Sequence, residues 1–157
     1  MTLRLVPLVA GGDLAALAER LAPGFGGDKA APLATLEQTV AMLEAHPRAE
    51  PWGAYLACLE EAAVGTCAFK AAPDEEGAVE IAYFTFPAFE RRGHATAMAG
   101  ALTDMAFDAG AETVVAHTLP EENASTRALR RTGFAFARDV VDPEDGPVWR
   151  WERTCRG

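Results

Sequence analysis

A short polar turn between an apolar run and a helical pattern constrains this chain more than any other feature of its sequence. The run 79–86 is apolar enough for a buried strand. After the turn 90–94, small or apolar residues follow the spacing of one helical face: Ala95, Met98, Ala99, Leu102, Met105, Ala106 and Ala109. The sequence therefore predicts a strand, a turn and a helix in direct succession.

The residues of this turn are suited to an anion. The segment 90–96 reads Glu-Arg-Arg-Gly-His-Ala-Thr and leads into a helix N-terminus, where unpaired backbone N–H groups and the helix dipole attract negative charge. It lacks the Gly-Lys-Ser/Thr of a P-loop and the three glycines of a dinucleotide fingerprint. Two interpretations stay open at this point: a phosphate-binding turn, and an ordinary connection with two solvated arginines.

Composition excludes several classes of protein. A chain of 157 residues has the size of one domain, so we expect a single domain over residues 1–157. No apolar run approaches the roughly 20 residues of a membrane span, and the first residues do not read as a signal peptide. The three cysteines lack metal-ligand spacing, and the net charge of −9 argues against a nucleic-acid surface. We therefore expect a cytoplasmic protein without a metal, membrane or nucleic-acid partner.

The other periodicities predict a mixed α/β sheet with helices on both faces. Helical spacing covers 13–21 and 33–43, and a later helix has Asn123 or Ser125 as its cap and Gly133 as its stop. Strand patterns occur at 3–6, 55–59, 64–69, 113–118, 134–140 and 148–152.

Two motifs of this sequence resemble those of the GNAT acetyltransferase superfamily. Residues 80–96 are similar to the strand, turn and helix that bind acetyl-CoA, with Gly93 and Ala95 in the small positions of the Q/R-x-x-G-x-G/A signature. Residues 117–134 resemble the second motif, in which an Asn and a Ser precede a helix that ends in Gly-Phe. The most similar branch contains ribosomal-protein N-terminal and small-amine acetyltransferases.

The resemblance implies a fold and a co-substrate. The fold is a single GNAT-like domain with a mixed, mostly antiparallel sheet of about seven strands flanked by about four helices. Acetyl-CoA would bind with its pyrophosphate over the turn and its pantetheine arm along 84–86. Glu90 departs from the signature, and we expect it to face solvent because a carboxylate repels pyrophosphate. The implied cofactor-binding residues are Phe84, Thr85, Phe86, Arg91, Arg92, Gly93, His94, Ala95, Thr96 and Asn123.

The implied reaction is acetyl transfer to a primary amine by direct attack of the nitrogen. An alkylammonium has a pKa of about 10, so a base must remove its proton. Glu80 is the candidate base, because the resemblance places a catalytic Glu at this point and because burial in an apolar strand would raise its pKa. The alternative is a structural carboxylate at a strand end, either exposed or paired with an arginine.

The acid that protonates the departing thiolate is less evident. Many family members carry a Tyr where this chain has Leu129. Resemblance to a Ser-bearing branch makes Ser125 the candidate acid, with helix capping as its alternative and Tyr83 as a substitute. A backbone N–H from 84–86 would stabilise the oxyanion. His117 either lines the substrate pocket or is structural.

The acceptor is expected to be a small or peptidic primary amine, cationic at neutral pH, because an acidic chain attracts ammonium groups. Glu121 or Glu122 would help Glu80 to hold that ammonium. Two other functions stay open: an acyl-CoA-binding module without turnover, and transfer of a longer acyl group. The oligomeric state is also open, with a homodimer as one alternative.

Overall fold

The computed structural model describes residues 3–8, 14–28, 30–45, 49, 51–60 and 62–155. Its elements follow in the order β1 (Arg4–Pro7), α1 (Leu14–Leu21), η1 (Ala22–Phe25), α2 (Ala30–Ala45), β2 (Ala54–Leu59), β3 (Ala62–Phe69), β4 (Ala78–Thr85), η2 (Pro87–Phe89), α3 (His94–Asp108), β5 (Thr113–Thr118), α4 (Ala124–Arg131), β6 (Ala135–Asp142) and β7 (Gly146–Thr154).

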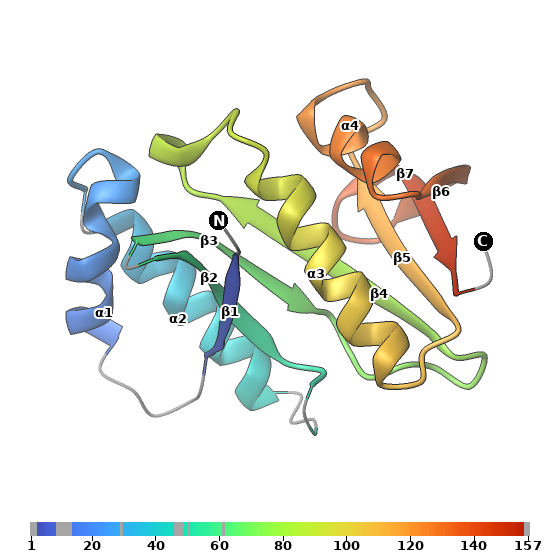
Figure 1. Ribbon diagram of the computed structural model, residues 1–157, viewed down its shortest axis with the longest axis horizontal. Helices are drawn as coiled ribbons and strands as arrows, with labels where there is room; N and C mark the ends of the chain where they lie inside the picture. Colours follow the sequence, from blue (N-terminus) through green and yellow to red (C-terminus); the bar gives the residue numbers. More distant parts are fainter. Residues whose placement is uncertain are drawn as a thin grey trace.

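The strands form one seven-stranded sheet in the order β1-β2-β3-β4-β5-β7-β6 (Figure 1). Only β4 and β5 run parallel; the other neighbours are antiparallel. The predicted mixed, mostly antiparallel sheet is therefore confirmed. The last hairpin is inserted with β7 against β5 and β6 at the edge, an order that the succession of strand patterns does not determine.

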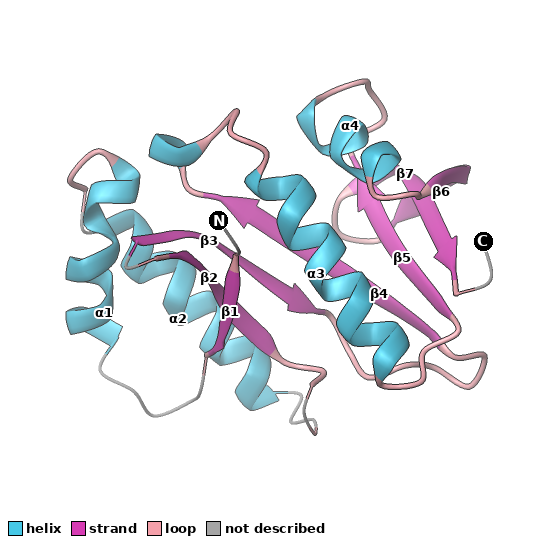
Figure 2. Cartoon of the chain, viewed as in Figure 1, coloured by secondary structure: helices cyan, strands magenta, loops and turns pink. Residues whose placement is uncertain are grey.

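Helices lie on both faces of the sheet (Figure 2). Because side chains alternate between the two faces of each strand, each face has its own core. On the face covered by α3 and α4, Val79 and Ile81 of β4 pack with Met98, Leu102 and Leu129. On the opposite face, Leu56 and Cys58 of β2 pack with helical residues of α1 and α2: Ala18, Leu21 and Leu36. The central strands are therefore sandwiched between helices.

Helix ends follow the residues that the sequence predicts. Gly110 and Gly133 come directly after the C-caps of α3 and α4 and have left-handed φ angles of 99° and 90°. Helix α2 starts earlier than the predicted residue 33, because Asp28 accepts a 2.8 Å hydrogen bond from the Ala30 N–H. Pro32 then falls in the first turn, where proline is tolerated. The predicted start of α1 at Asp13 lies outside the described residues.

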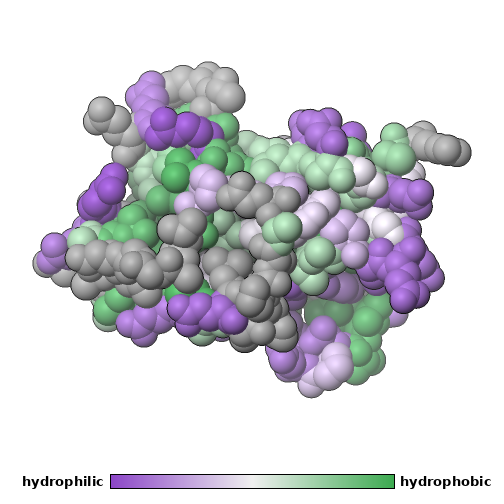
Figure 3. Space-filling view, turned by 90° about the horizontal axis from the view of Figure 1, so that it is seen from below, coloured by the Kyte–Doolittle hydropathy of each residue, from purple (hydrophilic) through white to green (hydrophobic). Residues whose placement is uncertain are grey.

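Apolar and hydrophilic residues are mixed over the surface. Seen from below, both kinds are visible toward each end of the molecule (Figure 3). Within the described ranges, no helix is long and apolar enough to cross a membrane.

Candidate active site

The two parallel strands separate near the middle of the sheet. Their pairing runs from Ala78↔Thr113 to Ile81↔Ala116, although β4 continues to Thr85 and β5 to Thr118. A cavity of about 290 Å³ lies at this opening and is lined from both strands. The carboxyl ends of parallel strands are a common place for ligands in such sheets.

The backbone of β4 presents free donors to this opening. The Phe86 N–H donates to Val64 O at 2.8 Å, and Glu80 O accepts from the Lys70 N–H at 2.9 Å. The even-numbered residues of β4 therefore direct their backbone groups toward β3, and the odd-numbered ones toward the opening. Within 84–86, the Thr85 N–H is the one that faces the opening. The predicted oxyanion donor is therefore narrowed from three residues to the Thr85 N–H, because the N–H groups of Phe84 and Phe86 face β3.

The turn before α3 has the features of an anion site. Gly93 is the N-cap with φ 83°, and no side chain caps the helix. The Ala97 N–H donates to Gly93 O, whereas the N–H groups of 94–96 have no partner in the described chain. A Cβ on Gly93 would meet nothing within 4 Å, so open space lies where a phosphate would approach. Of the turn residues, Glu90, Arg91 and Arg92 are exposed, as expected for Glu90.

The turn is also held in an unusual backbone conformation. Arg91 has φ 65°, a left-handed conformation that costs energy for a residue with a Cβ and that is found preferentially at functional sites. The Arg92 guanidinium lies 5.8 Å from the centre of the Phe89 ring. Partial burial, together with the Arg92 charge, lowers the pKa of His94 below its ordinary value. His94 is therefore mostly neutral at neutral pH and adds little positive charge of its own.

Glu80 lies where β4 and β5 are about to separate, opposite Val115. Its Oε2 atom is 3.1 Å from Lys70 Nζ and 3.0 Å from His117 Nδ1. The side chain is 27% exposed and lines the cavity. The alternative of pairing with an arginine is wrong: the partners are a lysine and a histidine, and they hold one carboxylate oxygen while Oε1 takes part in neither contact.

One ring nitrogen of His117 contacts Glu80, and the other is buried. We assign the proton to Nδ1, which can then donate to the Glu80 carboxylate. Nε2 is buried and has no hydrogen-bond partner in the described chain. This atom is closed off from solvent, while His117 itself lines the cavity beside Glu80.

Ser125 and Tyr83, the two candidate acids, are hydrogen-bonded to each other. Ser125 Oγ lies 3.0 Å from the Tyr83 hydroxyl, and both residues line the cavity. Burial raises the pKa of Tyr83, and the hydrogen bond with Ser125 partly offsets that rise. The phenol is therefore protonated at neutral pH and can serve as a donor.

The cap of α4 is Asn123, which settles the alternative left open with Ser125. The Asn123 side chain accepts from the Thr126 N–H at 3.0 Å, and Thr126 Oγ1 accepts from the Asn123 N–H at 2.9 Å. This reciprocal capping box occupies the Asn123 side-chain oxygen. Only its amide N–H groups remain to meet a ligand, and Ser125 is free of the capping role.

Two acidic residues that were predicted to hold the ammonium do not line the cavities, and a lysine beside Glu80 was not predicted from the sequence. Glu122 forms an ion pair with Arg130, and neither Glu121 nor Glu122 lines the two cavities described. Lys70 is the missed residue. Lys70 directly follows β3, and its N–H donates to Glu80 O of β4. Antiparallel pairing of those strands could therefore have predicted the contact of their side chains.

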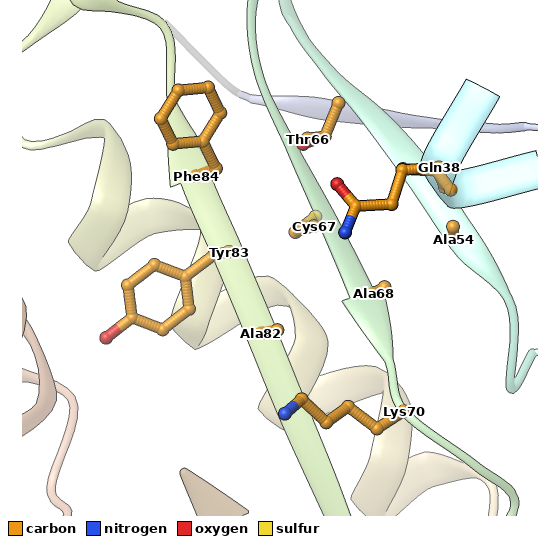
Figure 4. Close-up of a pocket in the computed structure, with 10 residues that line it drawn as sticks. Gln38, Ala54, Thr66, Cys67, Ala68, Lys70, Ala82, Tyr83 and Phe84 are labelled. Atoms are coloured by element: carbon orange, nitrogen blue, oxygen red, sulfur yellow. The ribbon is translucent and has the colours of Figure 1, made fainter. Parts of the chain in front are cut away.

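A second cavity, of about 350 Å³, lies on the α2 side of the sheet over β2, β3 and β4 (Figure 4). It shares Lys70, Ala82 and Tyr83 with the first cavity. The two cavities therefore meet at β4, next to Glu80. In the described residues, no group of three or more His, Cys, Asp or Glu side chains could hold a metal ion.

Comparison with known proteins identifies the family. Residues 2–135 match the family described as acetyltransferase (GNAT) domain, and the chain therefore belongs to the GNAT acetyltransferase family. The predicted family, fold and acyltransferase class are confirmed. A search of the curated proteins found no match.

Several solved structures share the fold. RimJ of Mycobacterium smegmatis in complex with CoA-disulfide has a TM-score of 0.76 at 17% identity, over 98% of this chain and 82% of that one. AAC(6')-Ib in complex with ribostamycin and coenzyme A has a TM-score of 0.74 at 20% identity, over 99% and 95%. A spermidine N-acetyltransferase SpeG chimera, partly from Vibrio cholerae, has a TM-score of 0.73 at 14% identity, over 98% and 96%. At these identities the similarity shows the fold.

Proposed function

We propose that this protein transfers the acetyl group of acetyl-CoA to a primary amine by direct attack, with Glu80 as general base. One observation carries the proposal: the Glu80 carboxylate and the Ser125–Tyr83 hydroxyl pair line the same cavity at the opening between β4 and β5. Family membership and the unpartnered N–H groups of α3 support acetyl-CoA as the co-substrate. CoA or acetyl-CoA is bound in several structures of the same fold.

The phosphates of acetyl-CoA would bind at the backbone of 93–96 and beside Arg91 and Arg92. These groups provide N–H donors, the positive end of the α3 dipole and two guanidinium charges. The pantetheine arm would then follow the free edge of β4 through the opening. The Phe84 side chain is exposed and lines the second cavity, while the Phe86 side chain is buried in the core on the α1 side.

The reaction would proceed in one displacement. The ammonium proton passes to Glu80, and the free amine attacks the thioester carbonyl carbon to form a C–N bond. Negative charge on the carbonyl oxygen is stabilised by the Thr85 N–H. The C–S bond then breaks, and the thiolate takes a proton from Ser125, which regains one from the Tyr83 hydroxyl. The nitrogen loses its second proton as the amide forms. That proton restores the Tyr83 phenol, and Glu80 releases the first proton to solvent.

The cysteines support direct attack over an acyl-enzyme. Burial raises the pKa of Cys67, the cysteine beside the second cavity, to about 12. Its thiolate, the nucleophilic form, is therefore scarce at neutral pH. Cys58 is also buried, and neither Cys58 nor Cys155 lines the two cavities.

Replacement of Glu80 tests the proposal. Glu80→Gln should lower the rate of acetyl transfer on the order of a hundredfold, leave acetyl-CoA affinity near wild type and weaken the acidic limb of the pH profile. Glu152→Gln is the matched control, because Glu152 lies in the same cross-strand row, is 32% exposed and pairs with Arg150 at 2.6 Å. Full activity with an unchanged pH profile in Glu80→Gln would reduce Glu80 to a structural carboxylate.

Thermal unfolding with CoA separates the remaining alternatives. A ligand at a hundredfold its dissociation constant adds about 2.7 kcal/mol of stability. Stabilisation by CoA without thiol release from acetyl-CoA on any amine would favour a binding module. Thiol release that is faster with succinyl-CoA than with acetyl-CoA would favour a longer acyl group.

A further inference from the structure

The second cavity is floored by a row of three alanines from three different strands. Ala54 of β2 lies opposite Ala68 of β3, and Ala68 lies opposite Ala82 of β4. All three point to the face covered by α2, since Leu56, two residues from Ala54, packs with Leu36 of that helix. Three methyl groups in a row leave the sheet hollow beneath α2, whose Gln38 lies across the floor (Figure 4). We call this hollow the alanine slot.

The two ends of the alanine slot differ in chemistry. At one end, the next cross-strand row contains Thr66 and Phe84, and the Phe84 ring is 43% exposed. At the other end lies Lys70, 3.1 Å from Glu80. A molecule in the slot would thus have an apolar floor, an aromatic wall and the proposed base at its far end.

Charge restricts what can occupy the slot. Lys70 is the one charged side chain among the described residues that line it, and its charge is balanced by Glu80. A polyamine or an aminoglycoside would need further carboxylates for its additional ammonium groups, and burial of an unpaired charge is costly. The volume of about 350 Å³ is at the lower end for ligand pockets, which span roughly 300–1,000 Å³.

We propose that the acceptor is a monoamine with an apolar body, such as an arylalkylamine, whose body fills the alanine slot and whose single amino group reaches Glu80. This inference rests on the proposed function and adds the acceptor class. It replaces the expectation of an acceptor held by several acidic residues. The apolar floor binds the body, and Glu80 Oε1, which neither Lys70 nor His117 contacts, accepts the one ammonium group. A second ammonium group would find no further carboxylate among the described residues that line the slot.

Acceptor preference is the first measurement. Thiol release from acetyl-CoA is followed with 2-phenylethylamine, methylamine, spermidine and ribostamycin. We expect kcat/KM for 2-phenylethylamine to exceed that for spermidine and ribostamycin at least tenfold. Turnover with the polycations in preference to 2-phenylethylamine would overturn the slot assignment and leave acetyl transfer intact. Thiol release with none of the amines, despite stabilisation by CoA, would overturn the proposed function itself.

Two variants tie that preference to the slot. Ala68→Leu fills the floor and should raise KM for 2-phenylethylamine at least tenfold, while KM for methylamine, which is too small to need the slot, and for acetyl-CoA stays within twofold. Gln38→Glu places a carboxylate over the floor from an exposed helix position and should raise kcat/KM for spermidine severalfold. An unchanged KM for 2-phenylethylamine in Ala68→Leu, or no gain for spermidine in Gln38→Glu, would contradict the assignment.

Discussion

The cofactor side and the acceptor side of this molecule are built by different means. The proposed cofactor site comes from one continuous segment: strand β4, the turn 90–93 and helix α3. The alanine slot, the proposed acceptor site, comes from single alanines on three strands. The strand register sets these alanines side by side, and α2 lies above them. In the proposed reaction, a local motif therefore positions acetyl-CoA, whereas long-range strand pairing shapes the space for the amine. The second arrangement can change in specificity without disturbing the first.

The largest expected effect is a loss of CoA affinity, and it tests the turn before α3. Gly93→Val should weaken CoA binding a hundredfold or more, because a side chain would project where the backbone meets phosphate and because φ 83° is strained for valine. Binding is measured by calorimetry. Gly110→Val is the matched control at the opposite end of α3: its φ is 99°, and its Cβ would also meet nothing within 4 Å.

Both variants carry similar backbone strain, so the difference between them isolates the phosphate site. CoA affinity at the wild-type level in Gly93→Val would refute the proposed phosphate-binding turn. An equal loss of CoA affinity in both variants would mean that the effect comes from the fold of α3 and not from a contact with the ligand.

The next effect tests whether the two sides are independent. Leu36 anchors α2 on the acceptor side and Leu102 anchors α3 on the cofactor side, and both are fully buried. Truncation of either to alanine should cost about 2–5 kcal/mol of unfolding free energy. Leu36→Ala should raise KM mainly for the amine, and Leu102→Ala should weaken mainly CoA binding. Denaturant unfolding and steady-state kinetics on the same samples check this, and identical kinetic changes in both variants would disprove the separation.

The smallest expected effect concerns the point where the two sides meet. Ser125→Ala should slow acetyl transfer about tenfold, less than Glu80→Gln, because a thiolate with a pKa near 8.5 leaves without a dedicated acid. Because the pKa of Tyr83 is raised, the phenol loses its proton only at a pH above its ordinary range. The Ser125–Tyr83 pair should therefore cause no alkaline decline in the rate of acetyl transfer near neutral pH.

Single-turnover rates with Ser125→Thr and Tyr83→Phe complete that test. The threonine keeps a hydroxyl and should restore most of the rate, whereas Tyr83→Phe should resemble Ser125→Ala. Wild-type rates in both Ser125→Ala and Tyr83→Phe would remove the pair from the reaction.

Much of the cofactor side could be predicted from sequence because its signals are local. These signals are the small residues on one face of a helix, the glycine at its N-terminus and the apolar strand before it. Each depends only on residues that are close together in the sequence. The turn was identified on this basis. The resemblance to the GNAT superfamily then implied Glu80 and Ser125, and the structure brings these two residues to one cavity. The pattern of Asn123 and Ser125 identified a helix start but left two caps possible, since either side chain can accept from the first turn.

The contacts that complete the site could not be predicted in this way. Lys70 and His117 meet at Glu80 from positions far apart in the chain, and the Tyr83–Ser125 hydrogen bond spans 42 residues. The placement of β7 between β5 and β6 has no local signature, because an antiparallel hairpin satisfies its own hydrogen bonds in either orientation.

The sequence by itself determined the type and order of the elements, the turn proposed to bind phosphate and the family to which the chain belongs. Those features depend on periodicity, on glycine positions and on short motifs, which act between residues a few positions apart. Only the tertiary structure decided which oxygen of Glu80 is held, which N–H of β4 is free and that three alanines lie in one row. Such features depend on strand register, and a shift of one residue would turn every one of these side chains to the other face of the sheet.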